Sequence, residues 1–156
     1  MFLTRYLFLL LIPLLSWGQL EKSIKYKVAM MQNFVKKGPD GEAAFWQAKG
    51  KVTFAIVNYT EEQNPLFKNL FIKQYQELLP IYQRMVVSED VKDTDLFIKT
   101  LIRQEEDYRA LLTPEQLQKY LNKLQYFEEN DPQANDSYSS LFFSEKLLNQ
   151  YKKAFR

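Results

Sequence analysis

The stretch Leu112-Thr113-Pro114-Glu115-Gln116 has the features of a helix start. Thr113 can serve as the N-cap, and Pro114 suits the first helical position, where a backbone N–H would have no partner. Gln116 stands three residues after Thr113, so its side chain can return a hydrogen bond to the backbone of the cap, which completes a capping box. The stretch therefore predicts that a helix begins at Thr113.

Hydrophobic residues recur at helical spacing on both sides of this start. The clearest stripe runs from Leu117 to Phe127, and Asn130-Asp131-Pro132 ends it. Weaker stripes predict further helices over about residues 20–35, 42–59, 64–87 and 95–111, and a last helix that carries Leu147 to Phe155. Residues 135–140 are polar and are predicted to form a loop. We expect an all-α fold with five to six helices arranged as helical hairpins in one domain, residues 19–156.

Two segments depart from a simple helical pattern. Residues 50–59 contain Gly50 and the run from Val52 to Val57, which would also suit a strand. A lone strand would have no partner in this chain, so a helix is the favoured interpretation. Pro80 lies inside the helix predicted over 64–87, where we expect a kink or a break.

Residues 1–18 have the pattern of a cleavable signal peptide. Arg5 follows Met1 in a short positive start, Tyr6 to Leu15 is an apolar core, and the small residues Ser16 and Gly18 precede a cut before Gln19. A membrane anchor is the alternative, but the apolar run has only about ten residues and a span needs about twenty. We therefore expect a secreted or periplasmic protein with no stable membrane span after cleavage.

The composition argues against most catalytic and metal sites. The chain has no His and no Cys, which excludes histidine-based general bases, thiol catalysis, zinc-thiolate sites and disulfides. Glu105, Glu106 and Asp107 form the densest acidic cluster, but neighbours on a helix point about 100° apart and do not converge. Glu105 and Arg109 fit an ordinary i, i+4 ion pair. We expect no enzyme activity, no cofactor and no metal site.

Charge is unevenly distributed, with a basic first third and a mildly acidic remainder. This is not the dense basic patch of a nucleic-acid binder, so no nucleic-acid partner is expected. The lysines of the first predicted helix are interpreted as a solvated face: Lys22, Lys25, Lys27, Lys36 and Lys37.

A second candidate motif lies fifty-three positions before the first, with Tyr59, Thr60 and Gln63 matching Leu112, Thr113 and Gln116. This pair resembles the two LTxxQ signatures of the Spy/CpxP family of small helical periplasmic proteins. Tyr59 departs from the family's leucine. Pro65 would clash with a helix that Thr60 had started, in which case Asn64 is the cap and Thr60-x-x-Gln63 is chance.

The resemblance implies a specific function. Spy/CpxP proteins are ATP-independent chaperones or regulators of envelope stress, and they form cradle-shaped antiparallel dimers that hold unfolded clients on a concave face. In this reading the six motif residues shape the hairpins and touch no client, and a homodimer is expected. The alternative is an exported helical adaptor, or a subunit of an envelope assembly, with one dedicated partner and no catalysis.

Overall fold

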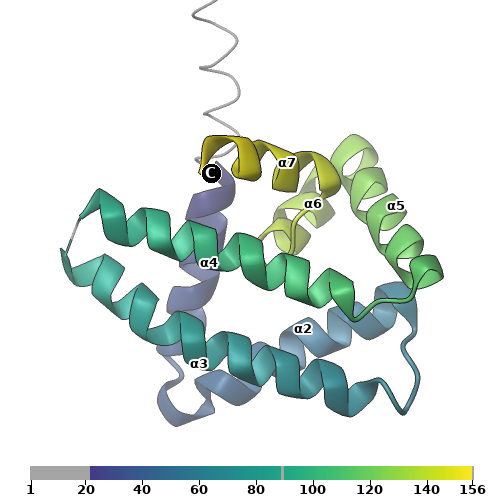
Figure 1. Ribbon diagram of the computed structural model, residues 1–156, viewed down its shortest axis with the longest axis horizontal. Coiled ribbons are helices and arrows are strands. Elements are labelled where there is room, and N and C mark those ends of the chain that lie inside the picture. Colours follow the sequence, from purple (N-terminus) through teal and green to yellow (C-terminus); the bar gives the residue numbers. More distant parts are fainter. Residues whose placement is uncertain (1–21, 89, 156) are drawn as a thin grey trace, which may run out of the picture.

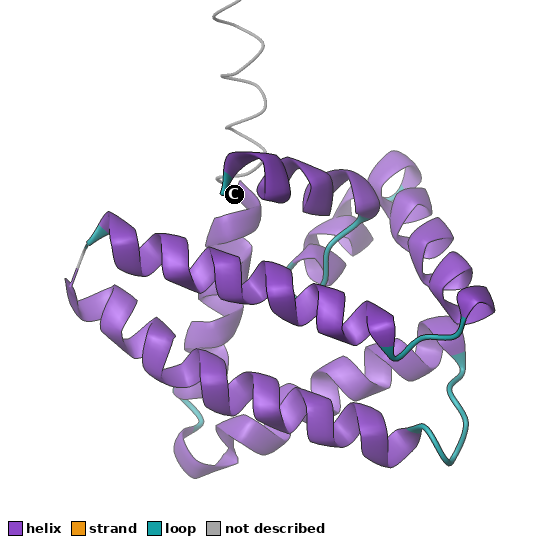
Figure 2. Cartoon of the chain, in the orientation of Figure 1, coloured by secondary structure: helices purple, strands orange, loops and turns teal. Residues whose placement is uncertain are grey.

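The computed structural model describes residues 22–88 and 90–155, so the predicted signal peptide lies outside the described residues. Within these ranges all regular structure is helical, which confirms the all-α prediction (Figures 1 and 2). A helix over 22–35 is followed by the remaining elements: the 3-10 turn η1 (Gly38–Asp40), α2 (Gly41–Val57), α3 (Asn64–Ser88), α4 (Val91–Ala110), α5 (Pro114–Asn130), α6 (Pro132–Ser139) and α7 (Glu145–Ala154).

The described residues thus form seven α-helices, and the expected number of five to six was too low. The additional helix is α6, which includes most of the segment predicted as a polar loop. Asp131 caps it by accepting a hydrogen bond from the backbone N–H of Ala134 at 3.0 Å, and Pro132 occupies its first turn. None of its residues is buried, so no apolar stripe could have revealed it.

Residues 50–57 belong to α2, which settles the ambiguity in favour of a helix. The helix ends at Asn58, whose φ of 50° is left-handed. Its buried stripe recurs every four residues and includes two polar side chains: Gly41, Phe45, Lys49, Thr53 and Val57.

Close packing at the start of α2 requires a glycine. A Cβ atom at Gly41 would lie 2.4 Å from the carbonyl oxygen of Phe34 and 2.6 Å from the hydroxyl of Tyr75. Gly41 therefore lets α2 begin directly against the end of the helix over 22–35 and against α3.

The helices α3 and α4 form a long hairpin that runs across the molecule (Figure 1). Pro80 does not break α3, which is continuous from Asn64 to Ser88. Asp90 begins α4 by accepting a hydrogen bond from the backbone N–H of Lys92 at 2.9 Å. In the described part of the chain, no helix is both long enough and apolar enough to cross a membrane.

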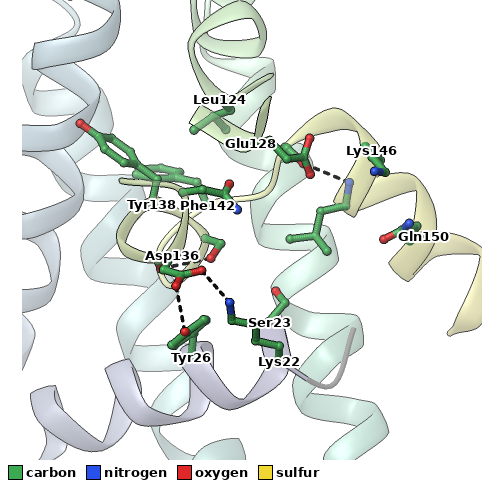
Figure 3. A pocket seen from close by; sticks show the side chains of 14 residues that line it. Lys22, Ser23, Tyr26, Leu124, Glu128, Asp136, Tyr138, Phe142, Lys146 and Gln150 are labelled. Carbon is green, nitrogen blue, oxygen red and sulfur yellow. Dashed lines mark hydrogen bonds and ion pairs between the residues drawn. The ribbon is translucent and has the colours of Figure 1, made fainter. Parts of the chain in front are cut away.

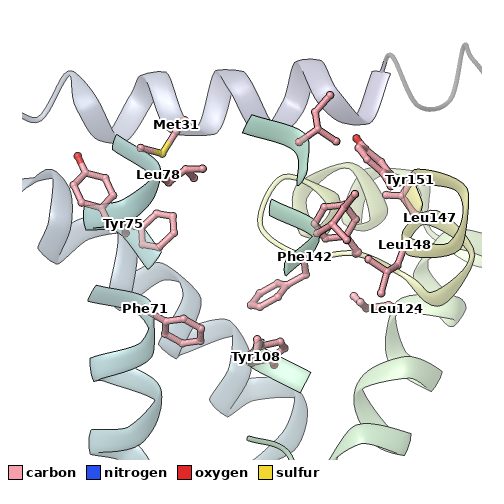
Figure 4. Close-up of a cluster of buried hydrophobic side chains, with 14 of the residues drawn as sticks. Met31, Phe71, Tyr75, Leu78, Tyr108, Leu124, Phe142, Leu147, Leu148 and Tyr151 are labelled. Carbon is pink, nitrogen blue, oxygen red and sulfur yellow. The ribbon is translucent and has the colours of Figure 1, made fainter. Parts of the chain in front are cut away.

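Aromatic rings fill the centre of the core, and Tyr108 on α4 is fully buried among them. Its ring contacts rings from three other segments at centroid distances of 5.1–6.0 Å: Phe67, Phe71, Tyr120 and Phe142. Figure 4 shows the helix over 22–35 running past two groups of these buried side chains, one around Tyr75 and Leu78 and the other around Leu148 and Tyr151. The first helix therefore joins the α2–α3 half of the core to the α5–α7 half.

Candidate functional site

The motif at residues 112–116 forms a closed capping box at the start of α5. The hydroxyl of Thr113 accepts a hydrogen bond from the backbone N–H of Gln116 at 3.2 Å, and the backbone N–H of Thr113 donates to Gln116 Oε1 at 3.0 Å. Leu112 is buried in the core beside it. These contacts satisfy backbone groups that the helix start would otherwise leave without partners.

The motif at residues 59–63 closes in the same way. Thr60 N–H donates to Gln63 Oε1 at 3.0 Å, and Gln63 N–H donates to the Thr60 hydroxyl at 3.3 Å. This box closes a turn, and α3 begins one residue later at Asn64. Pro65 therefore falls in the first turn of α3, where a missing N–H has no cost, and the expected clash with Thr60 does not arise.

The two boxes are bonded to each other through their glutamine side chains. Gln63 Nε2 donates to Gln116 Oε1 at 2.9 Å, and Gln116 Nε2 donates to Gln63 Oε1 at 2.8 Å. Each Oε1 thus accepts one bond from its own turn and one from the other motif. We call these residues, Thr60, Gln63, Thr113 and Gln116, the glutamine joint. Sequence reasoning paired the two motifs but did not predict that they touch.

The first position of each motif is apolar and packs beside the joint. Leu112 is buried, whereas Tyr59 is half-buried and packs between Phe54 and Phe67, at ring-centroid distances of 5.3 and 5.1 Å. The replacement of leucine by Tyr59 is therefore accommodated by aromatic neighbours.

Substitution of Gln63 and Gln116 by alanine, singly and together, tests the coupling within the joint. Each single variant should be destabilised by about 1–3 kcal/mol, because it leaves the partner amide unpaired. The double variant should lose less free energy of unfolding than the two single variants lose together, and the difference, the coupling energy, should be about 0.5–3 kcal/mol. Urea unfolding measures all three, and Gln118→Ala on the exposed face of α5 is the matched control. Additive effects would show that the two turns are independent.

A second polar cluster lies inside the core, around the carboxylate of Glu105 on α4. Glu105 is 2% exposed and accepts hydrogen bonds from Arg109 Nε at 2.9 Å and from the Tyr120 hydroxyl at 2.5 Å. Arg109 also donates to the carbonyl of Phe143 at 2.8 Å. The expected i, i+4 pair of Glu105 and Arg109 is thus present, but it is buried and connects α4, α5 and the segment before α7.

Lys27 is buried, so it does not belong to the solvated face predicted for the first helix. Its ammonium donates to the backbone carbonyls of Ser139 and Phe142 and to the hydroxyl of Ser23, and it lies 4.1 Å from the Phe143 ring centroid. All three of its hydrogens therefore have acceptors. Lys27 thus bonds the first helix to the last residue of α6 and to the segment that follows it.

Lys49 on α2 is the second buried lysine. It donates to Gln74 Oε1 at 2.9 Å, and its ammonium lies 5.1–5.4 Å from three aromatic rings: Phe45, Phe71 and Phe142. Gln74 in turn exchanges hydrogen bonds with Gln104 across the α3–α4 hairpin. Lys49, Gln74 and Gln104 therefore connect α2, α3 and α4 through hydrogen bonds inside the core.

Burial shifts the pKa values of both lysines downward. Loss of water lowers the pKa of Lys27 to about 7 and that of Lys49 to about 8, while the negative charge of Glu105 opposes the shift in each case. The positive charge of Lys49 adds to the lowering for Lys27. Burial also raises the pKa of the Tyr120 hydroxyl well above its usual value, with the charge of Glu105 adding to the effect. The protons of the two lysines are thus held weakly near neutral pH.

The sequence contained a signal for these buried lysines. Lys27 stands four residues from Ser23 and four from Met31, and Lys49 stands four from Phe45 and four from Thr53, so each lies on a buried stripe. Lysine is almost never fully buried unless it is paired, so the stripe alone did not predict that Lys27 and Lys49 are buried.

Apolar and basic side chains also meet on the outer surface of α2 and α3. Phe54 and Leu66 are 50% and 54% exposed, and Lys68 lies 4.5 Å from the ring of Trp46. Phe54 contacts the ring of Tyr59. We refer to these exposed or half-buried side chains of α2, α3 and the turn between them, Trp46, Phe54, Tyr59, Leu66 and Lys68, as the aromatic face.

Comparison with known proteins gave no relatives: no family model, curated protein or solved structure matches the chain. Among the described residues, no cluster of three or more acidic, His or Cys side chains is arranged to hold a metal ion. The features of the described residues that bear on function are therefore the glutamine joint and the aromatic face.

Proposed function

We propose that the protein is an exported protein-binding protein of the Spy/CpxP type, which acts in the periplasm as an ATP-independent chaperone or a regulator of envelope stress. In this proposal it binds unfolded or partner proteins of the cell envelope and catalyses no reaction. The predicted signal peptide accounts for export, and a homodimer is part of the proposal.

The observation that carries this proposal is the glutamine joint. The resemblance rests on two T-x-x-Q motifs, and a single such motif is explained by helix capping alone. Here both motifs form the same closed box and their glutamines bond to each other at 2.8 and 2.9 Å. A shared structural role favours one paired signature over two unrelated caps.

The aromatic face has the chemistry that a client surface needs. Exposed rings and aliphatic side chains offer large contact areas to apolar segments of an unfolded chain. Lys68 and the exposed Lys51 add positive charge, which attracts acidic segments over a longer range. Because Phe54 and Leu66 are half exposed already, clients can reach them without any opening of the core.

The test is aggregation of a chemically unfolded client, followed by light scattering in the absence of nucleotide. The purified protein should suppress aggregation at near-stoichiometric amounts. The paired substitution Phe54→Ser and Leu66→Ser should remove most of this suppression, because it deletes the exposed apolar contacts.

The matched control is Tyr126→Ser, which removes an equally exposed ring (55%) from α5. It should suppress aggregation like the unaltered protein, and circular dichroism should show all variants folded. If several unrelated clients aggregate unhindered, a general chaperone is ruled out and a dedicated partner becomes the better hypothesis. If suppression survives loss of Phe54 and Leu66, clients bind elsewhere.

A further inference from the structure

A polar pocket of about 230 Å³ lies between the first helix, α5, α6 and α7 (Figure 3). It is smaller than the roughly 300–1,000 Å³ that drug-sized ligands occupy, so it fits only a small molecule. Its lining combines both signs of charge with amides, hydroxyls and an apolar wall formed by Leu124, Phe142 and Leu147.

One end of the pocket is already closed by its own side chains. Asp136 on α6 pairs with Lys22 at 3.2 Å and accepts a hydrogen bond from the Tyr26 hydroxyl at 3.1 Å. Figure 3 shows these three side chains converging at this end. These contacts hold α6 against the first helix and leave little capacity for a ligand.

At the other end of the pocket, polar side chains have donor and acceptor atoms that no other described side chain occupies. Glu128 on α5 accepts one bond there, from the Ser144 hydroxyl at 3.0 Å, which leaves its second oxygen available. Lys146 and Gln150 on α7 extend from the same side of the pocket in Figure 3, and neither is paired with another side chain in the described structure. The carboxylate of Glu128 and the ammonium of Lys146 lie at this end and do not bond to each other. Their charges complement a ligand that carries an ammonium group and a carboxylate close together.

From this arrangement we propose that the pocket binds a free amino acid with an aliphatic side chain. Lys146 and Gln150 hold the ligand's carboxylate, and Glu128 holds its ammonium group. Leu124, Phe142 and Leu147 receive the side chain. The four charged residues of the pocket sum to zero, so a neutral zwitterion is favoured over a net anion or cation.

Binding of L-leucine to the purified protein tests this assignment by calorimetry and by the midpoint of thermal unfolding. Leucine should bind and raise the midpoint in a concentration-dependent way. Isoamylamine and 4-methylvalerate each lack one of the two charges and should bind at least tenfold more weakly, because one charged contact is lost. Glucose should not bind.

The variants Lys146→Met and Glu128→Gln should each weaken leucine binding about tenfold or more. Lys153→Met, an exposed position at the other end of α7, is the matched control and should bind like the unaltered protein. Absence of leucine binding, or binding that neither variant alters, would overturn the proposal. Preferred binding of glucose would assign the pocket to neutral polyhydroxyl ligands instead. No client is present in these measurements, so their outcome is independent of the chaperone test.

Discussion

Replacement of Glu105 by alanine is expected to destabilise the protein by about 3–5 kcal/mol, which is a large part of the total stability of a domain of this size. Glu105 is the carboxylate that balances a group of buried cations. Its removal takes away the acceptor of Arg109 Nε and the nearer of the two acceptors of the Tyr120 hydroxyl. It also removes the negative charge that favours the protonated forms of Lys27 and Lys49. Urea unfolding followed by circular dichroism measures the effect.

The neighbouring residue supplies the control. Glu106 lies next to Glu105 on α4, but its side chain is 44% exposed and forms an ion pair with Lys152 at the surface. Glu106→Ala should change the stability by less than about 1 kcal/mol, as is usual for exposed pairs. Glu105→Gln keeps hydrogen-bonding atoms but loses the charge, and it should fall between the two alanine variants. A Glu105→Ala variant as stable as Glu106→Ala would show that the carboxylate does not compensate the buried cations.

Local features of the fold could be predicted from the sequence because they depend on neighbouring residues. The start of α5 at Thr113 follows from capping chemistry that acts over three residues. The stripe from Leu117 to Phe127 follows from helical periodicity. A helix over residues 50–57 is favoured because a lone strand would have no partner, and the structure confirms the helix.

Long-range features could not be predicted in the same way. Gln63 and Gln116 are fifty-three residues apart, and nothing in their local sequence shows that their amides exchange hydrogen bonds. Lys27 reaches carbonyls more than one hundred positions away, so its burial depends on where the α6–α7 segment packs. The pocket between the first helix and α7 combines residues from four elements and has no signature in any of them.

The buried lysines also explain how the two ends of the chain are connected. Without cysteines, no disulfide can join the first helix to the C-terminal helices. Lys27 supplies a polar connection instead, because its ammonium bonds to backbone carbonyls that the segment between α6 and α7 would otherwise leave buried without partners. The cost of this connection is the desolvation of a positive charge, and this cost depends on pH.

Stability is therefore expected to rise between pH 6 and pH 9. In the unfolded chain the lysines keep their protons up to a pKa of about 10.5, whereas in the folded protein Lys27 and Lys49 lose theirs near pH 7 and pH 8. Above these values the unfolded state binds more protons than the folded state, so raising the pH favours folding, by up to about 1.4 kcal/mol per pH unit for each lysine. Below pH 7 both states hold the protons and the folded state bears the full cost of burial. Thermal and urea unfolding at each pH measure the slope.

This pH range is well suited to the test because the chain has no His or Cys side chain that would titrate within it. Lys27→Met removes one of the two buried ammonium groups and should reduce the slope markedly, while Lys36→Met, an exposed position at the end of the first helix, should leave it unchanged. Relative to the unaltered protein, the free energy of unfolding of Lys27→Met should be highest at pH 6, where the unaltered protein bears the desolvation of a charged Lys27. It should be lowest at pH 9, where Lys27 is already neutral and the variant only loses its hydrogen bonds to Ser139 and Phe142. A flat profile in the unaltered protein would mean that the three acceptors around Lys27 compensate its desolvation completely. Lys27 would then stay protonated across this pH range, held by its hydrogen bonds to Ser23, Ser139 and Phe142.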